Sequence, residues 1–123
     1  MVTVIEELLD EQEAIVEVRD LNVVFGRRQI LRDINLKIPA GQTLAVIGES
    51  GCGKTVLMKS IIGLVRPTSG QVTFDGNDIN QLNDRQLSHL RLRFGFVFQN
   101  AALFDSMTVG QNVAFPLRQH GRF

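Results

Sequence analysis

The sequence predicts an α/β fold in which a strand, a glycine-rich loop and a helix follow a long β-rich segment. The first observation is the apolar run Thr43–Ile47, which has the length and composition of a buried strand. Residues Val56–Leu64 then form an apolar stretch of helical type, and residues 48–55 separate the two. The second observation is the order, because two β-rich segments precede the loop and a third follows its helix. This order indicates a mixed sheet beside a parallel nucleotide-binding core rather than a simple alternating βαβ chain.

The residues before the loop divide into a tail and two strands. Residues 1–13 are acidic and lack turn residues, so we expect a frayed or weakly helical tail. Closely spaced apolar side chains predict β-structure over residues 14–25 and 30–38. Turns or breaks are expected at Gly26-Arg27-Arg28, at Pro39-Ala40-Gly41 and, after the helix that follows the loop, near Gly63 and Pro67.

The residues after the helix contain further strand and helix signals. Gln71–Phe74 reads as a short strand that ends at an Asp75-Gly76 turn. Asn83 with Gln86 has the spacing of a capping box and predicts a helix through about Leu92, with Leu87 and Leu90 facing inward. Phe94–Phe98 is expected to be an apolar strand with Gln99 at its C-terminal end, where ligands of parallel sheets gather. Thr108 with Gln111 predicts a last helix that ends at Pro116.

The loop itself is a complete G-x-x-x-x-G-K-[ST] motif that runs from Gly48 to Thr55. Gly48, Gly51 and Gly53 allow positive φ and close approach of the backbone to a ligand. The amides of residues 51–55 can then surround a polyphosphate at the positive end of a helix. Lys54 supplies an ammonium group for the β- and γ-phosphates, and the Thr55 hydroxyl is a ligand for Mg²⁺. The candidate nucleotide-binding residues are Gly48, Glu49, Ser50, Gly51, Cys52, Gly53, Lys54, Thr55 and Val56. The alternative is a glycine-rich turn with a chance Lys-Thr pair.

Composition and charge restrict the possible partners. The 123 residues carry 13 basic and 13 acidic side chains and a formal net charge of zero, so no global field favours nucleic acid. The single cysteine, Cys52, excludes an internal disulfide and fits a reducing compartment. A redox role for Cys52 has no resolving thiol to support it, and a small residue at a variable loop position is the simpler interpretation. No apolar run reaches the roughly 18 residues that cross a bilayer, so we expect membrane association through a partner rather than direct insertion.

Two other nucleotide-binding classes fit the loop less well. A dinucleotide-binding glycine motif built on Gly51 and Gly53 would need glycine at position 56, which is Val56. Small kinases and GTPases place the phosphate loop after the first strand, whereas here residues 1–42 and their β-rich segments come first.

The residues around the loop resemble those of the ATP-binding subunits of ABC transporters. The matching segments are Leu21–Gly26, Ile30–Leu36, Gly41, the loop itself, Leu57, Ile61, Gly63-Leu64, Pro67–Val72, Phe74–Gly76 and Phe96–Gln99. The resemblance covers residues 15–123 and leaves 1–14 as an acidic tail. It implies the N-terminal portion of a P-loop NTPase domain with a RecA-like parallel core and an antiparallel β subdomain, cut within the helical subdomain. Phe98–Val109 and Asn112–Leu117 look most like the Mla-type branch, whose members power phospholipid movement and organic-solvent tolerance.

The resemblance also implies roles for residues outside the loop. Phe25 matches the aromatic residue that stacks on adenine; the residues alone favour a core aromatic at a strand end, and the resemblance favours stacking. Gln99 matches the glutamine that reaches Mg²⁺ and the attacking water, with a polar strand end as the alternative. The segment after Gln99 is similar to the surface that receives the transmembrane permease subunits. Candidate contacts there are Leu103, Phe104, Met107 and Phe115, which core packing explains nearly as well. The implied assembly is a homodimer of ATP-binding subunits, peripheral on the cytoplasmic side of the inner membrane.

ATP hydrolysis needs more than a phosphate loop, including a carboxylate that holds Mg²⁺. The resemblance implies that an aspartate, the glutamate after it, a histidine further on and a Leu-Ser-Gly-Gly-Gln motif complete the site, and we find none of these in the sequence. Ala101–Asp105 resembles the expected strand and aspartate, but Ser106 follows instead of glutamate and the crossover before it is too short. Asp75 precedes glycine in a turn, and His89 and His120 are expected on the surface. We therefore expect this chain alone to bind ATP and hydrolyse it negligibly. The other functions left open are a non-transport soluble ABC ATPase and a nucleotide-binding module without catalysis.

Overall fold

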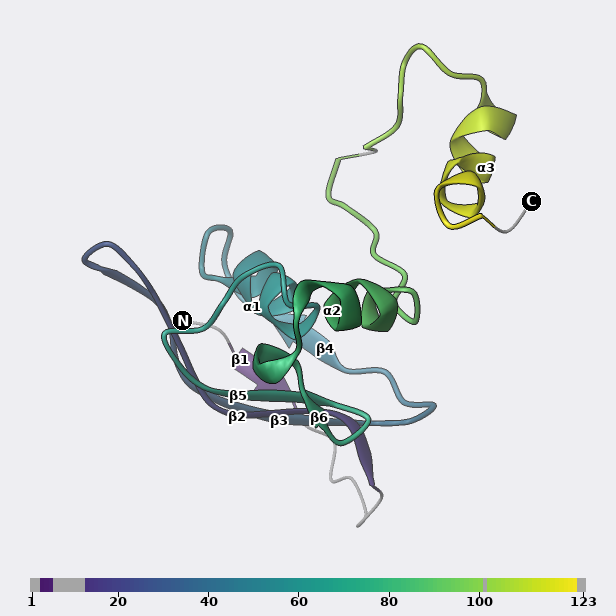
Figure 1. Ribbon diagram of the computed structural model, residues 1–123. Helices are drawn as coiled ribbons and strands as arrows, with labels where there is room; N and C mark the ends of the chain where they lie inside the picture. The colour runs from purple at the N-terminus through teal and green to yellow at the C-terminus, as the bar shows by residue number, and fades with distance from the viewer. Residues whose placement is uncertain (1–2, 6–12, 101, 122–123) are drawn as a thin grey trace.

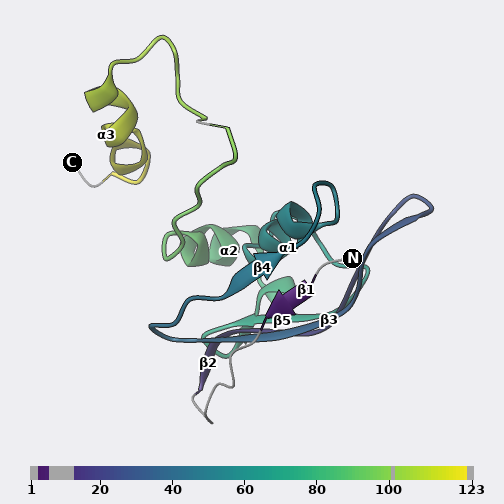
Figure 2. The same ribbon diagram turned by 180° about the vertical axis from the view of Figure 1, so that it is seen from behind.

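The computed structural model describes residues 3–5, 13–100 and 102–121. The elements in chain order are the strands β1 (Thr3–Ile5), β2 (Ala14–Phe25), β3 (Arg28–Pro39) and β4 (Ala45–Ile47), helix α1 (Lys54–Ile61), strands β5 (Ser69–Phe74) and β6 (Asn77–Asp78), the 3₁₀ turn η1 (Ile79–Gln81), and helices α2 (Asp84–Arg91) and α3 (Val109–Gln119). Figure 1 shows α1 and α2 over one face of an antiparallel sheet, with α3 set apart at the end of a long connection; Figure 2 shows the same separation from behind.

The main sheet has the strand order β3-β2-β5-β6, and all of its pairs are antiparallel. The predicted strands over 14–25, 30–38 and 71–74 are therefore confirmed, with β3 and β5 each starting two residues earlier. Val16, Val18, Leu21 and Val23 of β2 are buried, because side chains on one face of this strand meet the helices. The spacing from Val18 to Leu21 is three because the register of β2 shifts there, next to the positive φ of 47° at Asp20.

Two tight turns join the strands of this sheet. Gly26, at a φ of 61°, lies in the predicted turn that connects β2 to β3. Asp75 and Gly76 have φ values of 51° and 80° and link Phe74 to its ladder partner Asn77. Positive φ at both central residues is the type I′ geometry that matches the twist of a hairpin. The Asp75-Gly76 turn is confirmed, and the strand β6 that it creates was not predicted.

Helices α1 and α2 pack together over the sheet. Leu57 of α1 is completely buried and Leu90 of α2 is 8% exposed, so the predicted inward face of α2 is confirmed. The capping box of Asn83 and Gln86 is present in full. Arg91 ties the two helices, since its guanidinium donates hydrogen bonds to the carbonyls of Ile62 (3.0 Å) and Gly63 (2.9 Å) at the end of α1.

The strand before the phosphate loop differs from the prediction. β4 covers 45–47 rather than 43–47, and Ala45 and Ile47 are exposed, Ile47 by 56%. Its ladder partner is β1, antiparallel, so Thr3–Ile5 is a strand and the tail prediction is wrong for these residues; the remaining tail residues up to 12 lie outside the described residues. The backbone N–H and C=O groups of a strand need hydrogen-bond partners on a neighbouring strand. In the described part of the chain, β1 is the strand that pairs with β4.

Phe94–Phe98 is not a strand, contrary to the prediction. A strand exists only where a neighbour completes its ladder, and no described strand lies beside this segment. Its aromatic side chains instead make local contacts: Phe94 packs on Phe74 with ring centroids 4.6 Å apart, and Phe96 packs on Phe98 at the same distance.

Helix α3 begins where predicted and ends later. Thr108 and Gln111 form the predicted capping box. Pro116 lies inside the helix, which continues to Gln119, so the predicted end at Pro116 is wrong. Proline removes the hydrogen bond from its own nitrogen, whereas its carbonyl still accepts one from the His120 amide at 3.1 Å. Both histidines, His89 and His120, are exposed as expected.

Candidate nucleotide-binding site

The phosphate loop connects β4 to α1 as the sequence predicts. Gly51 and Gly53 adopt positive φ values of 78° and 109°; Gly48 is not among the described glycines that do. Gly53 also lies against β3. A Cβ atom at this position would be 3.0 Å from both the Ile30 carbonyl oxygen and the Leu31 Cδ2 atom. A side chain there would push the loop away from the sheet, so Gly53 fixes the height of the loop above β3.

The N-terminus of α1 differs from those of the other two α-helices. Helices α2 and α3 both begin with a side chain that accepts a hydrogen bond from a backbone amide. The N-cap residue of α1 is Gly53, which has no side chain, and no side-chain cap is present. Its first amides, including those of Lys54 and Thr55, are therefore left to an external acceptor, and the helix dipole makes an anion the preferred one.

Lys54 is folded over the loop. Its Nζ atom donates to the carbonyl oxygens of Gly48 and Glu49, the latter at 2.8 Å, and lies 3.6 Å from the Cys52 Sγ atom. Two carbonyl dipoles are a neutral environment for an ammonium group. A phosphate oxygen, which carries charge, makes a stronger hydrogen bond and can draw the ammonium away from them.

Thr55 and Gln99 lie on the same pocket. A cavity of about 430 Å³ is lined by Thr55, Met58 and Lys59 of α1 and by residues 96–100 and 102. Thr55 and Gln99 are both exposed, and each has an oxygen atom in its side chain. The strand that was expected to end at Gln99 is absent. Gln99 nevertheless lines the cavity, because the extended segment after α2 passes the start of α1. Sequence reasoning did not single out Met58 and Lys59, which are one helical turn beyond the loop.

Phe25 is at the end of β2, and 49% of its side chain is exposed. This exposure argues against the alternative of a core aromatic. Its cross-strand partner is Arg28, the first residue of β3. Cross-strand partners point to the same face of a hairpin, so an aromatic ring and a guanidinium are presented together at this end of the sheet.

The remaining loop residues surround these groups. Glu49 and Ser50 are exposed, Cys52 and Val56 are half-buried, and the amide of Cys52 donates to the Glu49 carbonyl at 3.2 Å. Residues 102–105 do not form a strand, and Ala101 lies outside the described residues. Asp105 therefore does not follow a strand, as a metal-binding aspartate of this kind would. In the described part of the chain no cluster of three His, Cys, Asp or Glu residues could hold a metal ion.

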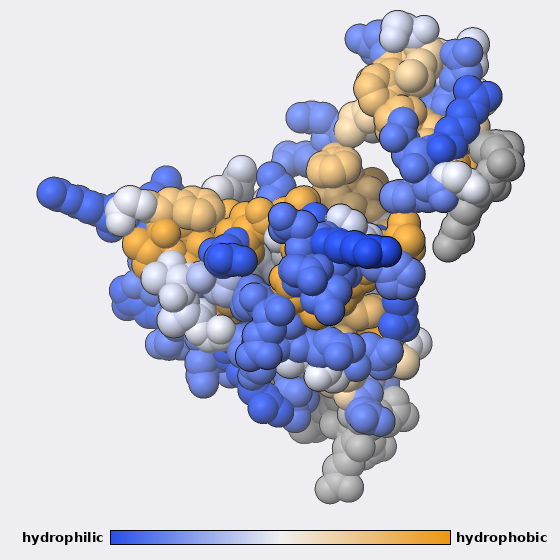
Figure 3. Space-filling view, in the orientation of Figure 1, coloured by the Kyte–Doolittle hydropathy of each residue, from blue (hydrophilic) through white to orange (hydrophobic). Residues whose placement is uncertain are grey.

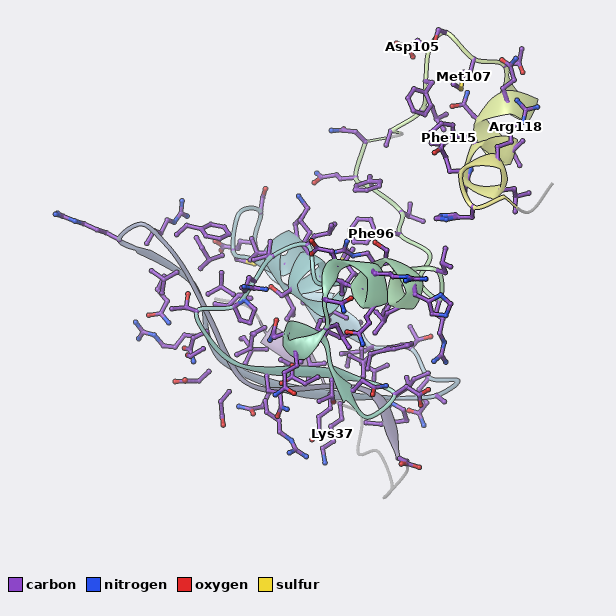
Figure 4. All side chains as sticks on the ribbon, in the orientation of Figure 1. Lys37, Phe96, Asp105, Met107, Phe115 and Arg118 are labelled. Atoms are coloured by element: carbon purple, nitrogen blue, oxygen red, sulfur yellow. The ribbon has the colours of Figure 1, made fainter. Side chains whose placement is uncertain are left out.

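The exposed apolar residues after Gln99 gather at α3. Leu103, Phe104, Val109 and Val113 are 65%, 47%, 82% and 71% exposed and border one groove with Met107 and Asn112. Phe104 also packs on Phe115 with ring centroids 4.8 Å apart. Figure 3 shows hydrophobic residues on the surface of this separate part of the molecule, and Figure 4 places Met107 and Phe115 within it. We call the groove lined by Leu103, Phe104, Asp105, Met107, Val109, Asn112 and Val113 the α3 groove.

A strand, a glycine-rich loop and a helix beside an antiparallel sheet are typical of a nucleotide-binding domain of the P-loop class. Residues 31–122 match the family model described as ABC transporter. The chain belongs to the ABC transporter family.

Two curated relatives and one solved structure show how much of a cassette is present. The chain is 46% identical over 105 residues to the probable ribonucleotide transport ATP-binding protein mkl of Mycobacterium leprae, covering 85% of this chain and 30% of that protein. It is 42% identical over 106 residues to the intermembrane phospholipid transport system ATP-binding protein MlaF of Haemophilus influenzae, covering 86% and 40%. A dimeric ATP-binding cassette in a post-hydrolysis state, bound to ADP and Pi, matches with a TM-score of 0.72 and 31% identity, covering 85% and 47%. The chain therefore spans less than half the length of each.

No helix within the described ranges combines the length and apolar character required to traverse a bilayer.

Proposed function

We propose that this chain carries the ATP-binding part of a subunit that couples ATP binding and hydrolysis to transport through a membrane partner. One observation carries the proposal: the helix after the Gly48–Thr55 loop begins without a side-chain cap, whereas α2 and α3 are both capped. A triphosphate supplies the missing acceptors for the amides of residues 51–55. Membership of the ABC transporter family supports the same assignment.

Lys54 and Phe25 would bind opposite ends of the nucleotide. Lys54 exchanges the carbonyls of Gly48 and Glu49 for β- and γ-phosphate oxygens, while Glu49, Ser50, Cys52 and Val56 form the loop around them. Phe25, half-exposed at the end of β2, stacks on the adenine ring.

Thr55 and Gln99 are the proposed Mg²⁺ contacts. Mg²⁺ takes oxygen ligands and in nucleotide sites is held largely by the phosphates, so two neutral side-chain oxygens on one cavity fit such an ion. Bound there, Mg²⁺ would neutralise charge that develops on the phosphates. Gln99 would also orient the attacking water. In the 123 residues alone we expect binding without turnover, because they contain no candidate carboxylate for that water.

The α3 groove is the proposed contact with the permease subunits. Leu103, Phe104, Met107 and Phe115 lie at or against it, and contiguous exposed apolar surface of this kind is typical of an interaction site. A second ATP-binding subunit would complete the assembly, peripheral on the cytoplasmic side of the inner membrane. The dimeric cassette that matches this chain supports the dimer.

We favour a phospholipid-like substrate for the transporter. The segments Phe98–Val109 and Asn112–Leu117 look like the Mla-type branch, and a phospholipid-transport ATPase is among the relatives. A relative described for ribonucleotide transport is at least as similar, so the substrate is decided by transport assays on the assembled complex. A non-transport soluble ABC ATPase would hydrolyse ATP with no permease bound and show no transport. A module without catalysis would bind ATP with no turnover even in the intact protein.

The decisive experiment is a calorimetric titration of the intact protein with ATP and Mg²⁺. Lys54→Ala should weaken ATP binding by about 100-fold or more, because it removes the charged donor to the phosphates. Lys37→Ala is the matched control. Lys37 lies on the opposite side of the sheet from the helices, 3.7 Å from Glu17, and should change ATP affinity less than twofold (Figure 4). Equal affinities for the Lys54→Ala and Lys37→Ala variants, with both folded, would refute the proposal.

A further inference from the structure

The end of β2 extends beyond its ladder with β5. The last pair of that ladder joins Asn22 to Ser69, whereas β2 continues to Phe25. In the described part of the chain, the ladder partners of Val24 and Phe25 belong to β3, and the hairpin of β2 and β3 extends past β5 (Figure 1). The register also shifts between Val23 and Val24, so the ladder is irregular there. A two-stranded hairpin is only marginally stable, so a further contact is needed to hold its end in one place.

Thr68 provides such a contact from the segment that enters β5. The Val24 amide donates a hydrogen bond to the Thr68 Oγ1 atom at 3.0 Å. The Thr68 amide in turn donates to the Asn22 carbonyl oxygen at 2.9 Å. The backbone and the side chain of one residue therefore bind β2 at two points. The Thr68 hydroxyl takes the place of a further backbone group of β5 and extends the contact to the residue before Phe25.

Thr68 is also closely linked to the helix that begins at the phosphate loop. The amides of Leu64 and Val65 both donate to the Lys59 carbonyl oxygen, at 2.8 and 3.3 Å, so α1 ends in a compact turn. Pro67, whose φ is restricted by its ring, then leads directly to Thr68. The phosphate loop and the end of β2 are thus connected through α1, this short segment and the Thr68 hydroxyl.

The position of the Phe25 ring depends on the backbone that carries it. The side chain is 49% exposed at the end of β2, so burial in the core does not fix the ring. The geometry of a binding residue must be held closely by its supporting contacts, and a small movement of the strand end changes how a ring meets a flat ligand. The hydrogen bond to Val24 lies one residue from Phe25 and limits that movement.

We propose that Thr68 is a positioning residue for base recognition: its hydroxyl holds the end of β2 so that the Phe25 ring is presented to adenine. This inference rests on the proposed ATP-binding function, in which Phe25 stacks on that base. Thr68 acts through Val24 and Phe25 rather than by touching the nucleotide. The contact is exposed, so without the hydroxyl a water molecule satisfies the Val24 amide but does not fix its place. Affinity for the base then falls while the fold persists.

The test compares ATP with inorganic tripolyphosphate, which has the phosphates and no base, by calorimetry on the intact protein with Mg²⁺. Thr68→Val keeps the shape of the side chain and removes the hydroxyl. It should weaken ATP binding about threefold to fivefold and change tripolyphosphate binding less than about twofold. Thr68→Ser keeps the hydroxyl and should bind ATP within about twofold of the unaltered protein. Thr73→Val is the matched control, because it makes the same change on β5 opposite Glu17, far along β2 from Phe25. Thermal unfolding shows that each variant is folded.

A double-variant cycle shows whether Thr68 acts through Phe25. Phe25→Ala should weaken ATP binding about tenfold and leave tripolyphosphate binding within about twofold. In the Phe25→Ala protein, Thr68→Val should have no further effect on ATP, because the ring that Thr68 positions is gone. A full additional loss would make Thr68 an independent contact and overturn the proposal. A Thr68→Val variant that weakens both ligands equally would overturn it as well.

The outcomes separate this inference from the function on which it rests. If Lys54→Ala and Phe25→Ala both weaken ATP binding while Thr68→Val behaves like Thr73→Val, the role of Thr68 is wrong and the ATP site stands. If Phe25→Ala leaves ATP affinity unchanged, stacking on Phe25 is wrong and the role of Thr68 falls with it. If Lys54→Ala has no effect, the proposed ATP-binding function fails first.

Discussion

Thr55 in the first turn of α1 and Gln99 in the extended segment after α2 line the same cavity. Gln99 is not at the end of a strand, since Phe94–Phe98 is not a strand. Their approach depends on how α2 is fixed against α1, and Arg91 fixes it by its hydrogen bonds to the carbonyls of Ile62 and Gly63.

We expect Thr55 and Gln99 to act together on Mg²⁺. Thr55→Val should weaken binding of ATP in the presence of Mg²⁺ by about tenfold and leave binding in EDTA almost unchanged, because the lost group is a neutral metal ligand. Gln99→Ala should act in the same direction, and the double variant should lose less than the product of the two effects. Thr43→Val, an exposed threonine outside the cavity lining, is the control. Independent effects that multiply in full would show that the two residues do not share an ion.

Gly70 is the glycine of the sheet that we expect to tolerate substitution least. It has a φ of 90°, and a Cβ atom there would be 2.3 Å from the Asp20 carbonyl oxygen, where β5 passes the irregular part of β2. Gly70→Ala should lower the free energy of unfolding by about 3 kcal/mol or more, since both strain and a backbone clash oppose it. Gly76→Ala is matched in φ, at 80°, but its Cβ would meet nothing within 4 Å. Gly76→Ala should lower the free energy of unfolding by only about 1 kcal/mol. Urea denaturation measures both, and equal losses would contradict the clash.

Arg91→Met should loosen α2 from α1. The half-buried guanidinium donates two hydrogen bonds, and its removal leaves the carbonyls of Ile62 and Gly63 without these donors. We expect a loss of about 1–3 kcal/mol in unfolding free energy. Arg85→Met, on an exposed site of the same helix, should change stability by less than about 0.5 kcal/mol. Because Gln99 follows α2, Arg91→Met should also weaken Mg²⁺-dependent ATP binding. An unchanged Mg²⁺ dependence would show that the Arg91 contact does not position Gln99.

The α3 groove can be tested without touching the nucleotide site. Val113 is 71% exposed, so Val113→Asp should leave stability within about 0.5 kcal/mol and ATP affinity unchanged. Placing a charge in an apolar contact should reduce co-purification with the permease subunits at least tenfold. Gln119→Asp, a charge at an exposed polar site on the same helix, is the control. If the Val113→Asp variant assembled normally with the permease subunits, the α3 groove would not be their contact site.

Features set by neighbouring residues were predicted well. The capping boxes at Asn83 and Thr108 and the turn at Asp75-Gly76 depend on interactions within a few residues, which the sequence displays directly. The candidate loop was recognised for the same reason, since its glycines and Lys54 are contiguous. The roles assigned to Phe25 and Gln99 came from the resemblance and remain predictions, although both side chains are exposed and available.

Features that depend on distant partners were predicted poorly. Phe94–Phe98 has the composition of a strand, but no described strand pairs with it. Thr3–Ile5 was predicted as part of a tail, and only its pairing with β4 makes it a strand. The cavity lined by residues 28–35 with Gly51 and Cys52 was not predicted, because it forms between β3 and the phosphate loop, which lie apart in the chain.

The sequence by itself determined the phosphate loop, the family and the turns and caps, because these arise from contiguous residues whose geometry is local. The tertiary structure decided which side chains share a cavity, how β1 and β4 pair, and that Gly53 rests on β3 opposite Ile30 and Leu31. Those relationships join residues far apart in the chain, and they form only when burial of Leu57, Leu90 and the β2 core brings the helices onto the sheet.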